Sequence, residues 1–257
     1  PCIQEGQSYG DIYGFKMTHV VRDEADLANY AYYVDKVPSQ PVYGPAAYAQ
    51  LTVEQQKNAQ KLAPGDAVWY DVNGDGIIDT HDQVKLGNSI PKWMGGFNTS
   101  ASWKGLTLFA RFDYALGYKK WNSGYQYFMG ITSGSFNVPE LAKKTWTEDN
   151  PTAGLPVLMT NDTNFKKNYT RNTSLFWENA AYLCAREISL SYDLPSQWTK
   201  KAMMEKVTVT LTGQNLFYVT SNNLYTPEYD SKNNTKDDGK GGYALPKTVL
   251  MGIKVVF

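Results

Sequence analysis

The sequence predicts an all-β fold, and within that class an antiparallel transmembrane β-barrel segment with long extracellular loops. Three observations support this prediction. Apolar and polar residues alternate along several stretches, as they do in half-exposed strands. Long and short connections alternate between those stretches, and outer-membrane barrels have short periplasmic turns and longer extracellular loops. Aromatic residues make up 14% of the chain, and such barrels carry aromatic girdles at both membrane interfaces.

The first predicted strand covers residues 9–21, YGDIYGFKMTHVV, which are rich in aromatic and β-branched residues. Residues 22–62 are polar, and residues 52–62 within them indicate a short helix that begins at a Thr cap. Residues 65–90 then form a loop that is rich in glycine and aspartate. We therefore expect a long connection between the first strand and the next.

Residues 92–118 contain the clearest β-hairpin of the sequence. Its arms, KWMGGFNTSASW and LTLFARFDYALGY, are separated only by Lys104 and Gly105, a two-residue turn in which glycine supplies the positive φ. One face of the second arm is apolar or aromatic throughout: Leu106, Leu108, Ala110, Phe112, Tyr114 and Leu116. The other face is mixed: Thr107, Phe109, Arg111, Asp113 and Gly117.

Three further strands follow a long polar segment, residues 119–174. Residues 182–192 and 207–217 each alternate and are joined by a short connection. A polar loop over residues 219–246 leads to the last strand, residues 247–257. Because six strands are predicted and the long connections all lie at one end, the chain should end with Phe257 in the periplasm.

Composition argues against several classes of protein. The formal net charge is zero, so nothing indicates a nucleic-acid partner. Cys2 and Cys184 form neither a metal motif nor a disulfide framework, and His19 and His81 lack metal-ligand spacing. No nucleophile motif stands out. We therefore expect a protein that is not an enzyme.

The sharpest local motif is the Asp-rich loop. Its residues occupy positions 1, 3, 5, 6, 7, 9 and 12 of an EF-hand-type calcium loop: Asp71, Asn73, Asp75, Gly76, Ile77, Asp79 and Asp82. Side-chain oxygens at alternating positions, with the carbonyl of Ile77, can surround one hard cation. The sequence predicts a structural calcium ion here, and the alternative is a turn-rich surface loop.

Five phrases, in order along nearly the whole chain, resemble the C-terminal part of SusC/RagA-like TonB-dependent transporters of Bacteroidetes. They are YGDIYGFK, YDVNGDGIIDTHDQVKLGNSIPKWMGGFNTSASWKGLTLFARF, LFWENAAYLCAREISLSYDLP, VTVTLTGQNLF and PKTVLMGIKVVF. Cys184 departs from the family, which tends to carry Arg or a similar residue there.

The resemblance implies that residues 1–257 are the C-terminal part of a 22-stranded barrel, with the plug and the earlier strands outside this chain. It also implies an importer of glycan or peptide fragments in the bacterial outer membrane. The implied partners are a SusD-like surface lipoprotein, TonB acting through the plug, the remaining barrel strands, lipid and the substrate.

Three groups of residues are candidates for function in such a barrel. Predicted lumen-facing residues that could contact substrate are Arg111, Asp113, Glu187, Gln214 and Lys254, although barrel interiors are polar in any case. Loop aromatics that could stack on sugar rings or a partner, or serve as girdle residues, are Trp121, Tyr125, Tyr127, Tyr225 and Tyr229. The outward residues of the last strand resemble a barrel-assembly signal: Val249, Met251, Ile253, Val255 and Phe257.

The alternative reading of the chain is a secreted, calcium-stabilised, carbohydrate-binding β-sandwich. It accounts for the aromatic residues and for the Asp-rich loop, but it gives no reason for all long loops to lie at one end. A dockerin-like adhesion module is a third reading, and it needs two calcium loops where the sequence has one.

Overall fold

The computed structural model describes residues 5–30, 32–34, 40–130, 140–158, 166–169, 171–222, 224, 226–228, 236–237 and 245–257. The chain divides into two compact units. We call the first the loop unit (Pro1–Ser89 and Trp121–Glu178) and the second the wall unit (Ile90–Lys120 and Asn179–Phe257).

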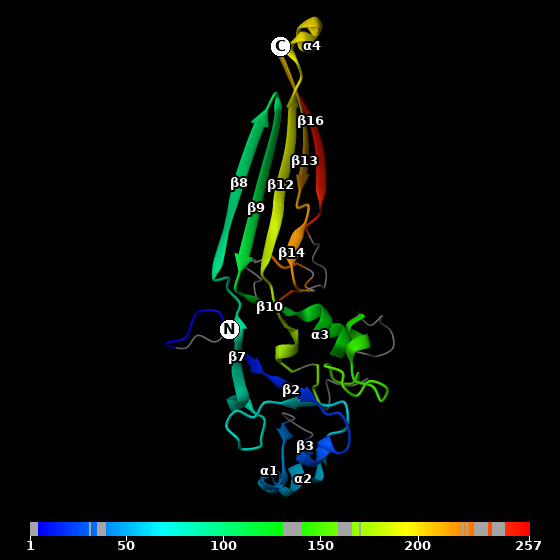
Figure 1. Ribbon diagram of the computed structural model, residues 1–257. Helices are drawn as coiled ribbons and strands as arrows, with labels where there is room; N and C mark the ends of the chain where they lie inside the picture. Colours follow the sequence, from blue (N-terminus) through cyan, green and yellow to red (C-terminus); the bar gives the residue numbers. More distant parts are fainter. Residues whose placement is uncertain are drawn as a thin grey trace. The chain divides into compact units, whose positions relative to one another are not determined.

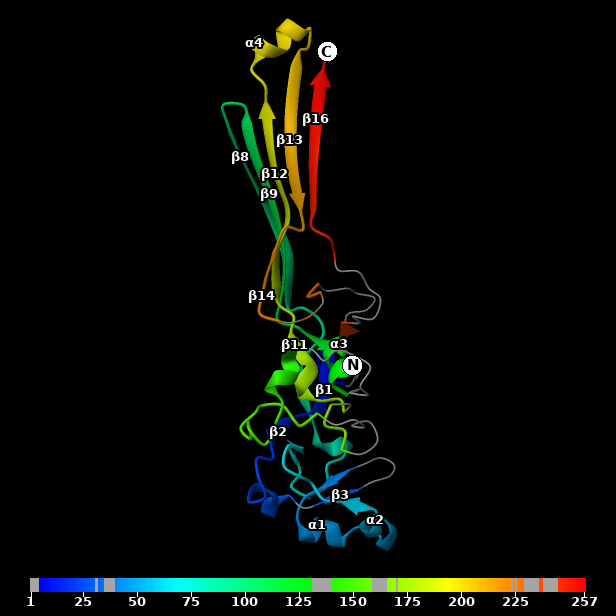
Figure 2. The same cartoon turned by 90° about the vertical axis from the view of Figure 1, so that its right-hand side faces the viewer.

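The wall unit is a sheet of long antiparallel strands (Figures 1 and 2). The order across the sheet is β8 (Trp93–Trp103), β9 (Leu106–Leu116), β12 (Tyr182–Asp193), β13 (Lys206–Gln214) and β16 (Thr248–Val256). A short strand, β14 (Tyr218–Thr220), pairs with the Tyr182 end of β12. The five long strands lie side by side in chain order, so the all-β, antiparallel fold class and five of the six predicted strands are confirmed.

Short connections join the strands at one end of this sheet. Lys104 and Gly105 have φ angles of 47° and 84°, the two positive values that a two-residue type I′ hairpin turn requires. At the same end, β12 and β13 are joined through α4 (Ser196–Thr199) and the 3-10 turn η5 (Lys200–Ala202). Both predicted short connections are therefore confirmed.

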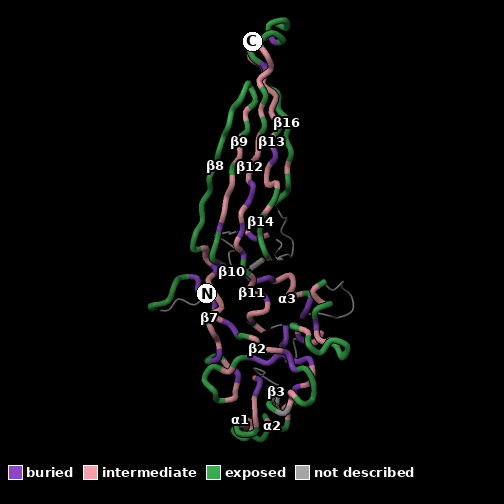
Figure 3. The backbone as a smooth tube through the Cα atoms, viewed as in Figure 1, coloured by how far each residue is buried: buried purple, intermediate pink, exposed green. Residues whose placement is uncertain are grey.

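The pairing register places apolar residues on one face of the sheet. Residues directly opposite each other on paired strands share a face. Leu108 lies opposite Ala101 and Leu190, and the row continues through Leu211 to Met251. Leu211 and Met251 are 51% and 73% exposed. We call this apolar side the outer face, and Figure 3 shows how little of β8 and β16 is covered.

The outer face has the dimensions of a membrane span. Trp93 and Trp103, both on this face and exposed, begin and end β8. Ten residue steps cover about 34 Å along a strand, and a tilt of ~35–45° reduces this to about 25 Å along the membrane normal, the height of the apolar band of outer-membrane barrels. The two tryptophans thus lie where interfacial aromatic girdles are expected.

The prediction that residues 9–21 form one wall strand is wrong. They form two short strands in the loop unit, β1 (Asp11–Phe15) paired with β7 (Gln83–Asn88), and β2 (Met17–Val20) paired with β6 (Ala67–Trp69). In β1, Asp11, Ile12, Gly14 and Phe15 are all buried, so both faces are covered. Aromatic and β-branched composition indicated a strand but could not distinguish a doubly covered strand from a strand of the wall.

The predicted helix over residues 52–62 is confirmed at its start and is shorter than expected. The helix is α2 (Val53–Lys57), and Thr52 caps it: the Gln55 amide donates to Thr52 Oγ1 at 3.2 Å, and the Thr52 amide donates to Gln55 Oε1 at 2.9 Å. It ends early because residues 59 and 60 form β5 (Ala59–Gln60) and pair with β3 (Tyr32–Val34).

The other elements are short. Those of the loop unit are η1 (Asp26–Asn29), β4 (Pro41–Val42), α1 (Pro45–Ala49), η2 (Thr80–Asp82), α3 (Ser123–Gly130), η3 (Glu140–Lys144) and η4 (Ser174–Phe176). The remaining three are β10 (Lys119–Asn122), β11 (Trp177–Asn179) and β15 (Lys236–Asp237). None of the described helices is long and apolar enough to cross a membrane.

The core of the loop unit contains a buried ion pair. Asp66 is fully buried and accepts hydrogen bonds from Lys166 Nζ, from the Ala63 amide at 2.7 Å and from Asn168 Nδ2 at 3.2 Å. Asn168 also accepts from the Ala67 amide at 3.1 Å. Because a buried carboxylate is costly unless paired and hydrogen-bonded, this network ties residues 166–168 to the start of β6.

The two faces of the wall sheet should differ in their tolerance of charge. Phe112 lies on the outer face near the middle of β9. The substitution Phe112→Arg should lower the free energy of unfolding in phospholipid vesicles by about 2–4 kcal/mol, the cost of a cation near the bilayer midplane. Thr107→Lys on the opposite face should cost only about 0.5–1.5 kcal/mol, the value of its hydrogen bond with Ser102. Equal losses would contradict the assignment of the faces.

Candidate functional site

The polar face of the wall sheet, which we call the inner face, holds all five predicted lumen residues. Arg111 lies opposite Glu187, and Glu187 lies opposite Gln214. Asp113 lies two residues from Arg111 on β9 and so shares its face, and Lys254 lies opposite Thr208, which pairs with Asp193. The structure thus brings these side chains to one face. That they line a substrate path stays a prediction.

Hydroxyl groups fill much of the inner face between the charged residues. Three pairs join neighbouring strands: Ser102 with Thr107 at 2.8 Å, Ser189 with Thr212 at 2.9 Å, and Ser191 with Thr210 at 2.9 Å. A hydroxyl can donate one hydrogen bond and accept others, so each pair keeps hydrogen-bonding capacity for water or a solute. Together these groups give a hydrophilic surface near the short-connection end, where Asp193 and Lys254 of the same face add charges.

A β-bulge at Arg186 changes which residues of β12 face inward. Ala185 lies opposite Phe112 and Glu187 lies opposite Arg111, so Arg186 is the extra residue in between. Strict alternation from Ile188 would have put Arg186 on the apolar outer face. Because of the bulge, the side chains of Arg186 and Glu187 both lie on the inner face. There Arg186 contacts Asp113 of β9, and Glu187 contacts Arg111 of β9.

Arg186 is the centre of a charged cluster. Its Nε lies 2.6 Å from Asp113 Oδ2, and its Nη1 lies 2.8 Å from both Asn215 Oδ1 and Glu228 Oε1. Glu228 Oε1 also accepts a hydrogen bond from the Tyr218 hydroxyl. This cluster lies toward the end of the sheet from which the long connections leave, the extracellular end by the usual asymmetry of such barrels.

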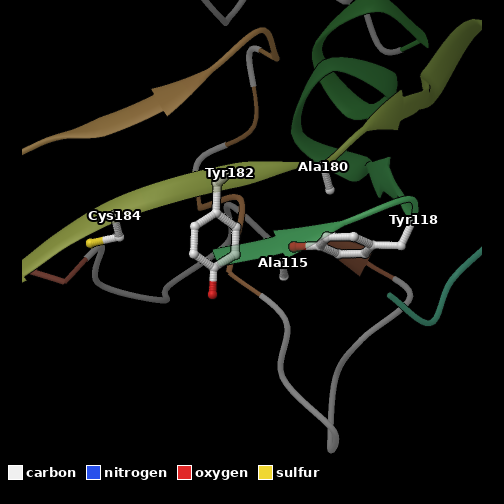
Figure 4. Close-up of a cluster of buried hydrophobic side chains, with 5 residues drawn as sticks. All are labelled: Ala115, Tyr118, Ala180, Tyr182 and Cys184. Atoms are coloured by element: carbon white, nitrogen blue, oxygen red, sulfur yellow. The ribbon is translucent and has the colours of Figure 1, made fainter. Parts of the chain in front are cut away.

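A small buried cluster continues the inner face beyond the charges (Figure 4). Tyr182 and Cys184 project from β12 to the same side, the side that they share with Ala115 of β9. Tyr118 and Ala180 complete the cluster, and the partly buried Tyr218 and Leu224 pack against it. The inner face at this end is therefore packed, whereas the other end carries the hydroxyl pairs.

Sequence reasoning missed Arg186 and Glu228, although one signal was present. Apolar residues occupy odd positions at Leu183 and Ala185, then even positions at Ile188 and Leu190. Such a one-residue change of phase within a continuous strand indicates a bulge near residue 186. No comparable pattern points to Glu228, because it lies in an irregular connection.

The predicted loop aromatics differ in exposure. Trp121 is only 5% exposed and packs with Met129, Tyr169 and Phe176, so it is a core residue of the loop unit and not a free stacking surface. Tyr125 packs against the same cluster, and Tyr127 makes an edge contact with Phe128 at a centroid distance of 5.5 Å. Tyr225 and Tyr229 lie outside the described residues.

A concave site in the loop unit was not anticipated. It has a volume of about 380 Å³ and is lined by Met17, Thr18, His19, Val20, Arg22 and residues 151–154. His19 Nε2 lies 3.6 Å from Asp26 Oδ2 at this end of β2. None of the predicted site residues belongs to it.

The Asp-rich loop is organised by hydrogen bonds from its own backbone. Asp71 accepts from the amides of Gly74 at 2.7 Å and Gly76 at 2.8 Å, while the buried Asp82 accepts from those of Val72 and Asp79, both at 2.8 Å. The hydrogen bond from the His81 amide lowers the pKa of Asp79.

Two of the loop glycines have positive φ, Gly74 at 75° and Gly76 at 78°, conformations that favour glycine. Within the described residues, no three Asp, Glu, His or Cys side chains gather in an arrangement that could hold a metal ion. The described geometry is thus that of a hydrogen-bonded turn, and calcium binding by this loop stays a prediction.

Comparison with known proteins gives consistent matches to one kind of protein. No protein-family model matches the chain. The TonB-dependent receptor P26 of Formosa agariphila is 28% identical over 204 residues, which cover 75% of this chain and 20% of that protein. The TonB-dependent receptor P39 of the same organism is 25% identical over 276 residues, which cover 99% of this chain and 26% of that protein. The chain thus spans a fifth to a quarter of the length of these relatives.

Two solved structures share the fold. One, the RagAB peptide transporter, has a TM-score of 0.59 and 27% identity, with 74% of this chain and 21% of that chain covered. The other, the RagAB peptide importer in its open-open state, has a TM-score of 0.60 and 20% identity, with 100% of this chain and 24% of that chain covered. At that lower identity the second match shows the fold alone.

If the Asp-rich loop binds calcium, the ion should stabilise the loop. For a dissociation constant of ~10⁻⁴–10⁻³ M, 5 mM calcium should stabilise the bound form by about 1–2 kcal/mol. The measurement is the rate of limited proteolysis of the full-length protein at this loop, with calcium against magnesium. Asp71→Asn, which removes the carboxylate at position 1 of the loop and keeps an oxygen that can accept from the Gly74 amide, should remove the difference, and Asp26→Asn, outside the loop, should not. If the unmodified protein were cleaved at the same rate with calcium and with magnesium, the loop would be a hydrogen-bonded turn that binds no calcium.

Proposed function

The chain belongs to the SusC/RagA-like family of TonB-dependent transporters of the outer membrane, and on this premise we propose that it forms part of the wall of an importer for peptide or glycan fragments. The observation that carries the proposal is the two-faced wall sheet. Its outer face is predominantly apolar on all five strands, and its inner face carries hydroxyl pairs and charged side chains. Lipid-facing apolar residues alternating with a polar lumen are the pattern of a transport barrel.

The open edges of the sheet support a larger barrel. Within the described residues, β8 pairs only with β9, and β16 pairs only with β13. Hydrocarbon does not tolerate an open sheet edge, because its unpaired backbone groups would find no hydrogen-bond partner there. The strands that complete the wall are then those of the rest of the transporter, in line with the fraction of each relative that this chain covers.

Partners follow from the same proposal. The solved relative is described as a peptide transporter, RagAB, and the partner proposed for this chain is a SusD-like surface lipoprotein. TonB would supply energy through a plug domain.

The exposed Phe257 and the outward residues of β16 would serve as the assembly signal. No step of bond chemistry is part of the proposed mechanism, which consists of binding, gating and translocation.

The β-sandwich alternative requires a second sheet over the apolar face. In the part of the wall unit that the structure describes, Val249, Met251 and Ile253 are 68%, 73% and 65% exposed. A sandwich would bury these side chains between its sheets. The exposed apolar face therefore favours the barrel.

The proposal is tested by uptake in a strain that lacks the full-length protein. Complementation with the unmodified protein should restore accumulation of fluorescent peptides from a casein digest or of labelled oligosaccharides, and removing TonB should abolish it. Thr210→Arg on the inner face should change the concentration dependence of uptake, because it adds a charge to the solute path.

The matched control is Leu211→Ile, a change of equal volume at the neighbouring, outer-face position of the same strand, which should leave uptake near the unmodified level. If restoring the unmodified protein to the deletion strain led to accumulation of neither substrate class, the proposal would be contradicted.

A further inference from the structure

One stretch of the last long connection lies against the inner face of the wall. We call residues 224 and 226–228 the inner segment. Three of its backbone carbonyls accept hydrogen bonds from the wall: Pro227 O from the Tyr118 hydroxyl, and Thr226 O and Glu228 O, both at 3.1 Å, from Lys120 Nζ. Leu224 packs against the buried cluster of Figure 4. The segment is therefore fixed through its backbone as well as its side chains.

The strongest link is between opposite charges. Glu228 Oε1 lies 2.8 Å from Arg186 Nη1, and the side chains of Arg186 and Glu228 are 18% and 21% exposed. The Tyr218 hydroxyl donates to the same carboxylate oxygen. Charge-assisted hydrogen bonds of this kind are stronger than neutral ones. Removing one partner of such a pair leaves the other charge partly buried and uncompensated.

Asp113 and Asn215 determine where Arg186 points. Asp113 holds the Nε side of the guanidinium at 2.6 Å, and Asn215 holds Nη1 at 2.8 Å. Asn215 adopts a left-handed backbone conformation, with φ of 52°. Because the guanidinium is planar and presents its donors in a fixed fork, these contacts leave Nη1 directed at the carboxylate of Glu228.

The bulge is what makes this arrangement available. Without an extra residue at position 186, the arginine would share the outer face with Ile188. The wall strand thus departs from regular pairing at Arg186, the residue whose guanidinium binds the carboxylate of Glu228, and bulges commonly re-aim a side chain in this way.

We propose that Arg186 is a positioning residue of the transport path, which clamps the inner segment to the wall through Glu228 and thereby narrows the lumen at its extracellular end. This inference rests on the proposed function. In this proposal the inner segment, which belongs to an extracellular connection, lies inside the mouth of the barrel. Lys120 and Tyr118 hold it there in addition to Arg186. The clamp sets which solutes pass, and it takes no part in energising transport.

The test measures how accessible the inner segment is, independently of uptake. In the full-length protein on intact cells, with its native cysteines, Cys184 among them, replaced by Ala, Thr226→Cys is labelled with a membrane-impermeant maleimide. Adding Arg186→Gln should raise the labelling rate about tenfold or more, because it removes charge-assisted hydrogen bonds. Glu228→Gln should produce a similar increase, and the two changes together should add little to either one, because both break the same link.

Arg111→Gln is the matched control, since Arg111 is the other inner-face arginine and its described ion pair is with Glu187 of β12 at 3.8 Å, within the wall itself. It should leave the labelling rate unchanged. Glu228→Gln lies outside the wall strands, so it tests the clamp even if Arg186→Gln prevents barrel assembly, which heat-modifiable gel mobility would reveal. Labelling that is unchanged in Glu228→Gln, or equally fast in Arg111→Gln, would overturn the clamp.

Uptake separates this inference from the proposed function. With the clamp opened, casein-digest peptides or oligosaccharides that the protein imports should enter with an altered apparent KM and altered size preference. Failure of the unmodified protein to import either class would refute the proposed function while the labelling result still decides the clamp.

Discussion

The structure of the wall depends on one constraint, which is that a sheet in hydrocarbon must pair its backbone groups and still present an apolar side to lipid. Because side chains alternate with period two, a slip of one residue between β9 and β12 would turn every outer residue of one strand inward. The observed register avoids this: Leu108 meets Leu190, and Leu190 meets Leu211. The two-residue turn at Lys104 and Gly105 fixes the register between β9 and β8. Once the outer residues are set by these registers, the alternate residues of each regular strand necessarily form the inner face.

The same constraint explains how much could be predicted from the sequence. The period-two pattern identified the five wall strands and assigned Arg111, Glu187 and Gln214 to one face, because each residue's face follows from its position along a regular strand. It failed for residues 9–21, whose short strands are covered on both sides. It also failed at Arg186, where the bulge breaks the regularity, and at Glu228, whose place depends on a long connection. Trp121 was misjudged because aromatic residues serve cores as well as surfaces.

The departure from regular pairing has a functional reading. Arg186 and Glu187 occupy adjacent positions and both reach the inner face, where one contacts Asp113 and the other Arg111. The regular part of the wall presents hydroxyl pairs, which suit solutes of many kinds because they carry no charge. The irregular part carries the Arg186 cluster, which holds the inner segment. In this account the sheet provides a general hydrophilic path, and the bulge adds selectivity at its extracellular end.

The central claim is that one face of this sheet meets lipid and the other meets an aqueous lumen. It is tested most directly by spin labels placed one at a time along β9, from Leu106 to Tyr114, in the full-length protein in lipid bilayers. Collisions with molecular oxygen, which concentrates in lipid, should peak at Leu106, Leu108 and Phe112. Collisions with a water-soluble nickel complex should peak at Thr107 and Arg111. A profile without a two-residue period, or with the two phases exchanged, would contradict the account.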